Sequence, residues 1–383
     1  MLGKRITLFK LLGFDIQIDL SWVFIALLIA WTLARDYFPY KYHNLSETSY
    51  WIMGIGGALG LFTSIVLHEL GHSAVARTLG IPIKGITLFI FGGVAEMEGE
   101  PSTAQSEFKM AVAGPIVSVL IAIVCYPLFL FGQSLGWPVQ FTGVLFYLSW
   151  INGLLAAFNL VPAFPLDGGR LLRSLLWSRK HNLRQATRTA SAIGRGFGLF
   201  LIFAGILSLF YGNIIGGIWW FLIGLFLRNA SQMSYQQLEI RRALEGEPIR
   251  RFMQTQPITA PPYISVADLV HDYVYKYHHQ MFPVQTDSKL LGCISTSQVK
   301  QIPRDEWERH SVQELMAPCS EGNTISPETD AVHALSLMQS TGNSRLMVLD
   351  QGRLVGVITL KDLLHFLSLK VDLEGGKSGG LGI

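Results

Sequence analysis

Two histidines and a glutamate stand together in a stretch that is otherwise apolar. Residues 64–80, SIVLHELGHSAVARTLG, carry His68, Glu69 and His72 in their middle. Residues four apart share one face of a helix, so the two imidazoles can bind one Zn²⁺ at about 2.0–2.1 Å each. Glu69 then lies beside the metal, where it can take a proton from water that zinc has acidified. The alternative is a pair of hydrogen-bonded core histidines, but ionisable groups are costly in a membrane, which favours the metal site.

A catalytic zinc needs a third protein ligand and an open position. The sequence offers Asp167, in FNLVPAFPLDGGR, at the end of a later apolar run. The alternative for Asp167 is an N-cap for a helix that starts near Arg170, and taken alone that alternative is favoured. Membrane topology favours Asp167 as a zinc ligand. The apolar run that contains His68 and the run that ends at Asp167 both enter the membrane from outside, so both carry their residues toward the cytosolic side.

Asn159 lies eight residues before Asp167 in the same predicted span. A buried amide must find hydrogen-bond partners, and this one can hold a substrate backbone or stabilise an oxyanion. A hydrogen bond between helices explains it equally well. For Asn152 the bond between helices is favoured, and Gly114–Pro115 is assigned to helix packing.

The elements that position these residues are membrane spans. Half of the 383 residues are hydrophobic and 15% are charged, against about 25% in soluble domains. A span needs about 20 apolar residues. Six are predicted, at residues 16–34, 51–79, 108–132, 141–163, 194–211 and 214–230. The net charge of +3 is too small to indicate nucleic-acid binding, and three distant cysteines predict no disulfide framework.

Lysine and arginine in short loops predict how the spans are oriented. The connection after the fourth span is rich in arginine, whereas the loops GQSLGWPVQ and YGN carry no charge. Both termini are therefore predicted in the cytosol, in a multi-pass protein of the cell membrane. Residues 81–99 are too short and too β-branched for a span, and their alternation predicts a membrane-associated β insertion.

An internal repeat with a period near 64 follows the last span. Each copy is predicted as strand–helix–strand–strand–helix, and such units usually pack against each other. The predicted fold class is thus a polytopic α-helical membrane protein with a cytosolic α/β domain. The predicted parts are a membrane domain (1–230), a linker helix (231–247), an α/β domain (248–370, with copies 248–303 and 312–370) and a disordered tail (371–383).

These motifs together resemble the site-2 protease family of intramembrane zinc metalloproteases. The resemblance covers about residues 50–175: HELGH in one span, FGGVA in the β insertion, AGP in the next span and NLVPAFPLDGG in the one after. It implies that His68, His72 and Asp167 bind one zinc per chain, and that Glu69 is the general base.

The same resemblance implies how substrate is held. Substrates in this family are single-span membrane proteins, which implies that Asn159 acts near the scissile peptide. The insertion 81–99, with Gly92 and Gly93, would bind substrate as an added strand. An unwound span bares N–H and C=O groups, and a strand edge can satisfy them. Ser118 stands where many members have Asn.

The C-terminal repeat resembles a tandem CBS pair, and such pairs often bind ATP, ADP or AMP. Thr359 and Asp362, in GVITLKD, fit the family's Gly-x-x-Thr/Ser-x-x-Asp pattern, whose Asp holds ribose hydroxyls. The first copy has Gln298 at the Asp position, so at most one such ribose site is expected. The alternative is a structural or homodimerising module without a ligand.

Three classes of function remain open on the sequence alone. The favoured one is an intramembrane zinc protease in the lipid bilayer, modulated by adenine nucleotide at the CBS pair. The alternative is a CBS-regulated membrane transporter or channel without protease activity, which leaves His68, Glu69 and His72 unexplained. A catalytically inactive scaffold is a third, although no metal-binding residue is missing.

Overall fold

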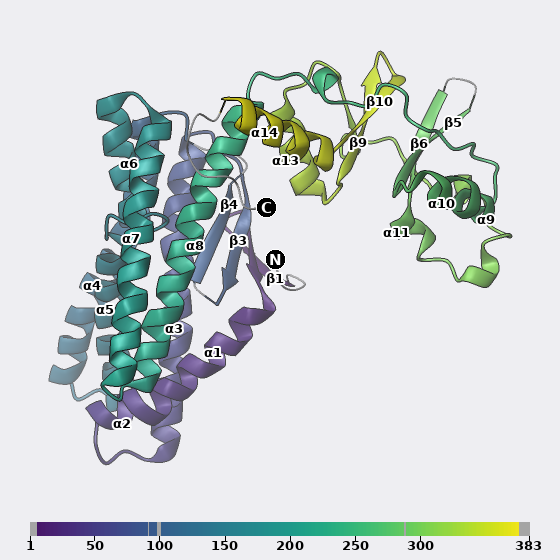
Figure 1. Cartoon of the computed structure of the whole chain (residues 1–383). Helices are drawn as coiled ribbons and strands as arrows, with labels where there is room; N and C mark the ends of the chain where they lie inside the picture. The colour runs from purple at the N-terminus through teal and green to yellow at the C-terminus, as the bar shows by residue number, and fades with distance from the viewer. Residues whose placement is uncertain (1–5, 91, 98–100, 287–288, 375–383) are drawn as a thin grey trace. The chain divides into compact units, whose positions relative to one another are not determined.

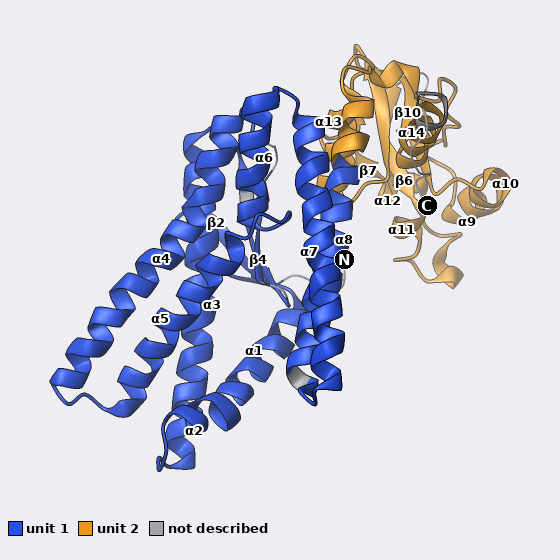
Figure 2. Ribbon diagram, turned by 60° about the vertical axis from the view of Figure 1, so that its left-hand side comes forward, with its two compact units in different colours: residues 1–237 blue, residues 238–383 orange. Residues whose placement is uncertain are grey.

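The computed structural model describes residues 6–90, 92–97, 101–286 and 289–374. The chain divides into two compact units, residues 1–237 and 238–383 (Figure 2). The first unit contains long helices and one small sheet, and the second contains two three-stranded sheets with shorter helices (Figure 1).

Helices form most of the first unit. They are α1 (Leu20–Thr32), η1 (Leu33–Tyr37), α2 (Phe38–Lys41), α3 (Glu47–Thr78), α4 (Ala104–Ser134), α5 (Val139–Asn159), α6 (Asp167–Lys180), α7 (Leu183–Phe210) and α8 (Ile214–Leu244). Among the described residues, five helical stretches are long and apolar enough to cross a membrane: Leu20–Lys41, Glu47–Thr78, Ala104–Ser134, Val139–Asn159 and Leu183–Phe210. The sixth predicted span, residues 214–230, forms the first part of α8.

Polar caps define where several of these helices begin. The Asp19 side chain accepts the amide of Ser21 at the start of α1, and Thr103 accepts the amide of Ser106 at the start of α4. Such caps satisfy N–H groups that a helix leaves unpaired at its first turn. The first span was predicted from residue 16, which is too early, because strand β2 continues to Ile18 and Asp19 caps the helix that follows.

The first unit also holds a four-stranded sheet in the order β1-β2-β3-β4. Its strands are β1 (Ile6–Leu11), β2 (Phe14–Ile18), β3 (Ile83–Phe89) and β4 (Gly92–Met97). The predicted β insertion is confirmed as β3 and β4, whereas the N-terminal hairpin β1–β2 was not predicted; β2 pairs with β3 in parallel. Alternate residues of β2 are buried together with Val66 and Leu70 of α3, so the sheet lies against the HELGH helix (Figure 1).

The fourth predicted span ends earlier than expected. α5 ends at Asn159, and Asp167 opens the separate helix α6. Pro162 and Pro165 lie between them, and proline removes a backbone donor and disfavours helix at the preceding residue. The N-cap of α6 is Leu166, so Asp167 does not cap this helix with its side chain.

The second unit has two sheets, β5-β6-β7 and β10-β9-β8. Its strands are β5 (Met281–Thr286), β6 (Lys289–Ser295), β7 (Ala317–Pro318), β8 (Thr324–Ile325), β9 (Arg345–Asp350) and β10 (Arg353–Thr359). Its helices are η2 (Ile249–Arg251), α9 (Val266–Asp268), η3 (Leu269–Val274), α10 (Tyr275–Tyr277), α11 (Thr296–Val299), η4 (Arg304–Glu306), α12 (Val312–Leu315), α13 (Ala331–Thr341) and α14 (Leu360–Glu374).

The second copy has the predicted order β8, α13, β9, β10, α14. In the first copy the first strand is reduced to an isolated bridge between Ala260 and Val284. α14 continues to Glu374, four residues into the tail predicted from residue 371. The rest of that predicted tail lies outside the described residues.

Candidate metal centre

Three predicted ligand atoms converge at one buried point between α3 and α6. Asp167 Oδ2 lies 3.1 Å from His68 Nε2 and 3.3 Å from His72 Nε2, and the two Nε2 atoms are 3.3 Å apart. The three residues are 4%, 5% and 9% exposed for His68, His72 and Asp167. A tetrahedral zinc with bonds of about 2.0–2.1 Å separates its ligand atoms by about 3.3 Å. The described donor set therefore fits three corners of a zinc site.

The neighbouring helix α4 sets which nitrogen of each imidazole faces this point. His72 Nδ1 lies 2.7 Å from the Met110 carbonyl, which can only accept, so Nδ1 carries the proton and donates it. His68 Nδ1 lies 2.8 Å from Ser118 Oγ, a fully buried hydroxyl. Such partners leave Nε2 as the metal-binding atom and hold the ring in place.

Gly114 lies between these two partners and touches both rings. A Cβ there would lie 2.5 Å from His68 Nε2 and closer still to His72 Nε2. Only a residue without a side chain fits, so the assignment of Gly114 to helix packing was incomplete. The spacing by four of Met110, Gly114 and Ser118 places them on one face of a helix, but it does not show what that face contacts.

We expect Gly114→Ala to weaken zinc binding by about 10- to 100-fold, the range found when groups supporting metal ligands are changed. The added methyl must push the imidazoles apart. Competition with a chromophoric chelator measures this directly. Gly153→Ala on α5 is the matched control, because a Cβ there meets nothing within 4 Å; equal affinity in both variants would contradict the expectation.

Glu69 lies next to the ligand set and beneath the edge strand of the sheet. A Cβ on Gly93 would lie 2.7 Å from Glu69 Cγ, so the backbone of β4 passes directly over this side chain. β4 is the edge of the sheet on this side. Glu69 therefore follows the ligand His68 in the chain and lies against the edge strand.

The remaining predicted residues lie in several places. Asn159 is the last residue of α5 and is half-buried, and it is not one of the three converging groups. Asn152 is buried and donates to Ser64 Oγ of α3 at 3.0 Å, a bond between helices as predicted. Thr359 and Asp362 lie at the start of α14 in the second unit.

Known proteins are similar to this chain along nearly its whole length. Residues 56–141 and 134–205 match peptidase family M50, and residues 312–369 match the CBS domain. Rip3 of Mycobacterium tuberculosis is 31% identical over 95% of this chain and 93% of its own length. The chain belongs to peptidase family M50. The zinc metalloprotease MJ0392 of Methanocaldococcus jannaschii is 30% identical, over 96% of this chain and 97% of its own length.

A solved structure is similar to part of this M50 protein. The site-2 protease from Methanocaldococcus jannaschii is 33% identical, with a TM-score of 0.42, and covers 60% of this chain and 94% of that one.

These comparisons confirm three of the sequence predictions. The chain is a multi-pass membrane protein and a zinc metalloprotease of the site-2 type, with a CBS domain at its C-terminal side. The alternative of a transporter without protease activity is set aside, because relatives over the full length are zinc metalloproteases.

Proposed function

We propose that this M50 protease hydrolyses a peptide bond within or near the transmembrane helix of a single-span membrane protein. His68, His72 and Asp167 hold the zinc, and Glu69 is the general base. The observation that carries this proposal is the convergence of the three ligand atoms at 3.1–3.3 Å from one another, beside Glu69.

The chain's own residues account for the steps of hydrolysis. Zinc, when bound, supplies a Lewis acid that polarises a carbonyl and lowers the pKa of water. The Glu69 carboxylate accepts a proton from the attacking water and then delivers it to the leaving amide nitrogen. The hydrogen bond of His72 to the Met110 carbonyl and the contact of His68 with Ser118 keep both rings in place throughout.

The outer edge of β4, which is the last strand of the sheet among the described residues, binds the unwound substrate as an added strand at Gly92 and Gly93. Support comes from Gly93, whose backbone passes directly over Glu69. Val94→Cys on this strand, 47% exposed, should form disulfides with cysteines at alternate positions of a substrate segment, since strand residues alternate in direction. A continuous or helical pattern of cross-links would contradict this proposal, and Leu59→Cys on α3 is the control.

Asn159 is proposed to stabilise the oxyanion of the scissile carbonyl. Support comes from the resemblance of NLVPAFPLDGG, which contains Asn159, to the site-2 protease motif. Removal of one such donor typically lowers kcat by about 10²–10³. Asn159→Ala should therefore lower kcat with zinc content unchanged, and a change in KM alone would contradict the assignment.

The experiment that tests the function uses purified protein in liposomes with a panel of tagged single-span membrane proteins from the same cell. Mass spectrometry of the products locates the cleaved bond. The expected result is a cut within or near a span, lost with a zinc chelator and restored by added zinc. Cleavage only in soluble loops, or cleavage that survives chelation, would contradict the proposal.

Adenine nucleotide is proposed to bind the CBS pair and modulate the protease. The motif residues Thr359 and Asp362 form a helix cap: Asp362 Oδ2 accepts from Thr359 N at 3.0 Å and from Thr359 Oγ1 at 2.7 Å. Ser295 and Gln298 make the same box in the first copy. A ribose hydroxyl would therefore have to use Asp362 Oδ1.

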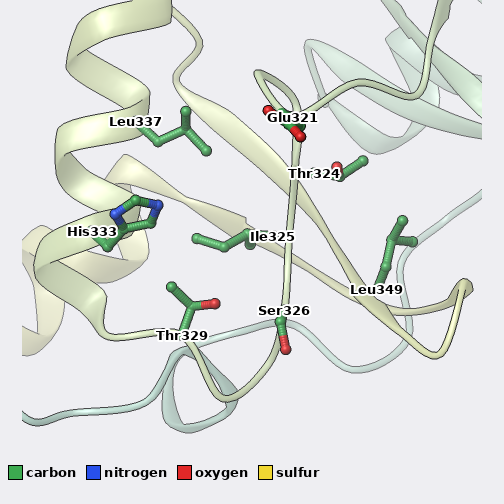
Figure 3. A pocket seen from close by; sticks show the side chains of 8 residues that line it. All are labelled: Glu321, Thr324, Ile325, Ser326, Thr329, His333, Leu337 and Leu349. Carbon is green, nitrogen blue, oxygen red and sulfur yellow. The ribbon is translucent and has the colours of Figure 1, made fainter.

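A second feature of the second copy offers another place for the nucleotide. A cavity of about 430 Å³ lies between α13 and β8 (Figure 3). His333 and Leu337 extend into it from α13, facing Ile325. It also presents hydroxyl groups suited to a ribose; these belong to Thr324, Ser326 and Thr329.

Calorimetric titration of the full chain with ATP, ADP and AMP distinguishes the two places. Asp362→Asn keeps an oxygen for the helix cap but removes the charge, and should abolish binding if the motif holds the ribose. Thr329→Val should instead abolish nucleotide binding if the ribose lies in the cavity. If no nucleotide gives a heat of binding, nucleotide modulation is contradicted and the CBS pair is a structural module without a ligand. Light scattering of the same samples tests the predicted homodimer.

Both termini and the CBS domain are proposed to lie in the cytosol, supported by the arginine-rich connection after α5.

The three cysteines allow this orientation to be tested. Cys319 is exposed, whereas Cys125 and Cys293 are buried. Burial raises the pKa of the Cys293 thiol to about 11, which leaves little reactive thiolate at neutral pH. An impermeant maleimide should therefore label intact cells only after permeabilisation, and Cys319→Ser should remove the signal. Labelling of intact cells would reverse the orientation.

A further inference from the structure

The position of Asp167 relative to the histidines depends on how α6 is held. Asp167 is the first residue of α6, and this helix lies against α4 and α7. α4 also contacts α3 extensively and supplies the Met110 carbonyl and Ser118 to the two imidazoles. α4 is therefore the common support of all three ligands.

A buried ion pair joins α6 to this support. Arg173 Nε donates to Glu107 Oε1 at 2.6 Å, and a second guanidinium nitrogen of Arg173 contacts the same oxygen. The two side chains are 9% and 1% exposed, respectively. Glu107 lies one turn before Met110 on α4, so the ion pair anchors α6 next to the carbonyl that orients His72.

Arg173 also contacts the loop that leads into α6. Its guanidinium lies 5.0 Å from the centre of the Phe164 ring. The Phe164 carbonyl in turn accepts a short hydrogen bond from Ser231 of α8, and α7 approaches it closely at Gly194. One side chain thus ties both the loop before Asp167 and the helix after it to α4.

We infer that Arg173 and Glu107 are positioning residues of the metal centre, which hold the Asp167 carboxylate at bonding distance from the zinc. The inference rests on the ligand set proposed above. A buried ion pair is weak support for stability, because apolar residues of similar volume often replace one without loss. Arginine also supplies a planar fork with fixed donor directions, which lysine does not. An ion pair that adds little to stability but has fixed donor directions is suited to holding Asp167 in position.

The test measures zinc affinity by chelator competition, and the visible absorption of the Co²⁺-substituted protein, which reports ligand geometry. Arg173→Met should lower affinity by about 10- to 100-fold and alter the Co²⁺ spectrum, with Arg173→Lys in between. Arg35→Met is the matched control, since Arg35 pairs with Glu47 at 2.7 Å on the exposed surface. Its affinity should equal that of the parent.

Because Arg173→Met leaves a buried charge and can fail to fold, Glu107→Met/Arg173→Met is measured beside it, with thermal unfolding for all variants. A folded double variant that still binds zinc weakly supports the inference. A folded single or double variant with parental affinity and spectrum overturns it. If His68→Ala and Asp167→Ala themselves retain zinc, the ligand set has failed instead, so the two failures are distinguishable.

Discussion

His68→Ala, His72→Ala and Asp167→Ala should each purify with almost no zinc, whereas the parent should carry close to one zinc per chain. Each substitution leaves two protein ligands where a catalytic site needs three. The carboxylate supplies the only negative charge of the set, so its removal also removes the Coulomb attraction for the ion. Proteolysis should fall to background in all three variants.

Elemental analysis of detergent-purified protein measures this result. His43→Ala is the matched control, because His43 is an exposed histidine outside the ligand set, and it should keep the parental zinc content. Parental zinc in any of the three ligand variants would remove that residue from the site. No zinc in the parent would contradict the whole assignment.

Glu69→Gln should abolish proteolysis while the zinc content stays at the parental value. Glutamine has nearly the same shape as glutamate but cannot accept the proton of the attacking water. Loss of a general base typically lowers the rate by about 10²–10⁴. Because Glu69 is not one of the converging ligands, metal binding should be unaffected.

Single-turnover cleavage of a membrane substrate, with zinc measured on the same sample, tests this separation. Glu47→Gln, at the exposed start of the same helix, is the control. Loss of zinc together with activity would make Glu69 a metal ligand instead of a base. Parental activity would require a different base altogether.

The sequence alone determined those features that depend on short spacing. His68 and His72 come four residues apart, so any helix places them on one face. Long apolar runs predicted the spans, and the 64-residue period predicted a repeated α/β unit whose second copy matches the CBS domain, because these signals are local or repeated. The family motifs added the expectation of zinc proteolysis, which full-length relatives confirm.

Tertiary structure decided the features in which distant segments meet. The hairpin β1–β2 was missed because its strands are short and precede a span directly, and its pairing with β3 joins segments about 70 residues apart. Asp167 belongs to its own helix because two prolines interrupt the run from α5.

The contact surface of α4 could not be read from spacing alone, because it exists only once α3 and α6 pack on it. Gly114 looks like any small residue of a membrane helix until two imidazoles are found against it. Arg173 and Glu107 are 66 residues apart, and a single sequence carries no sign that they meet. Local periodicity determines which residues share a face, whereas only packing determines what that face contacts.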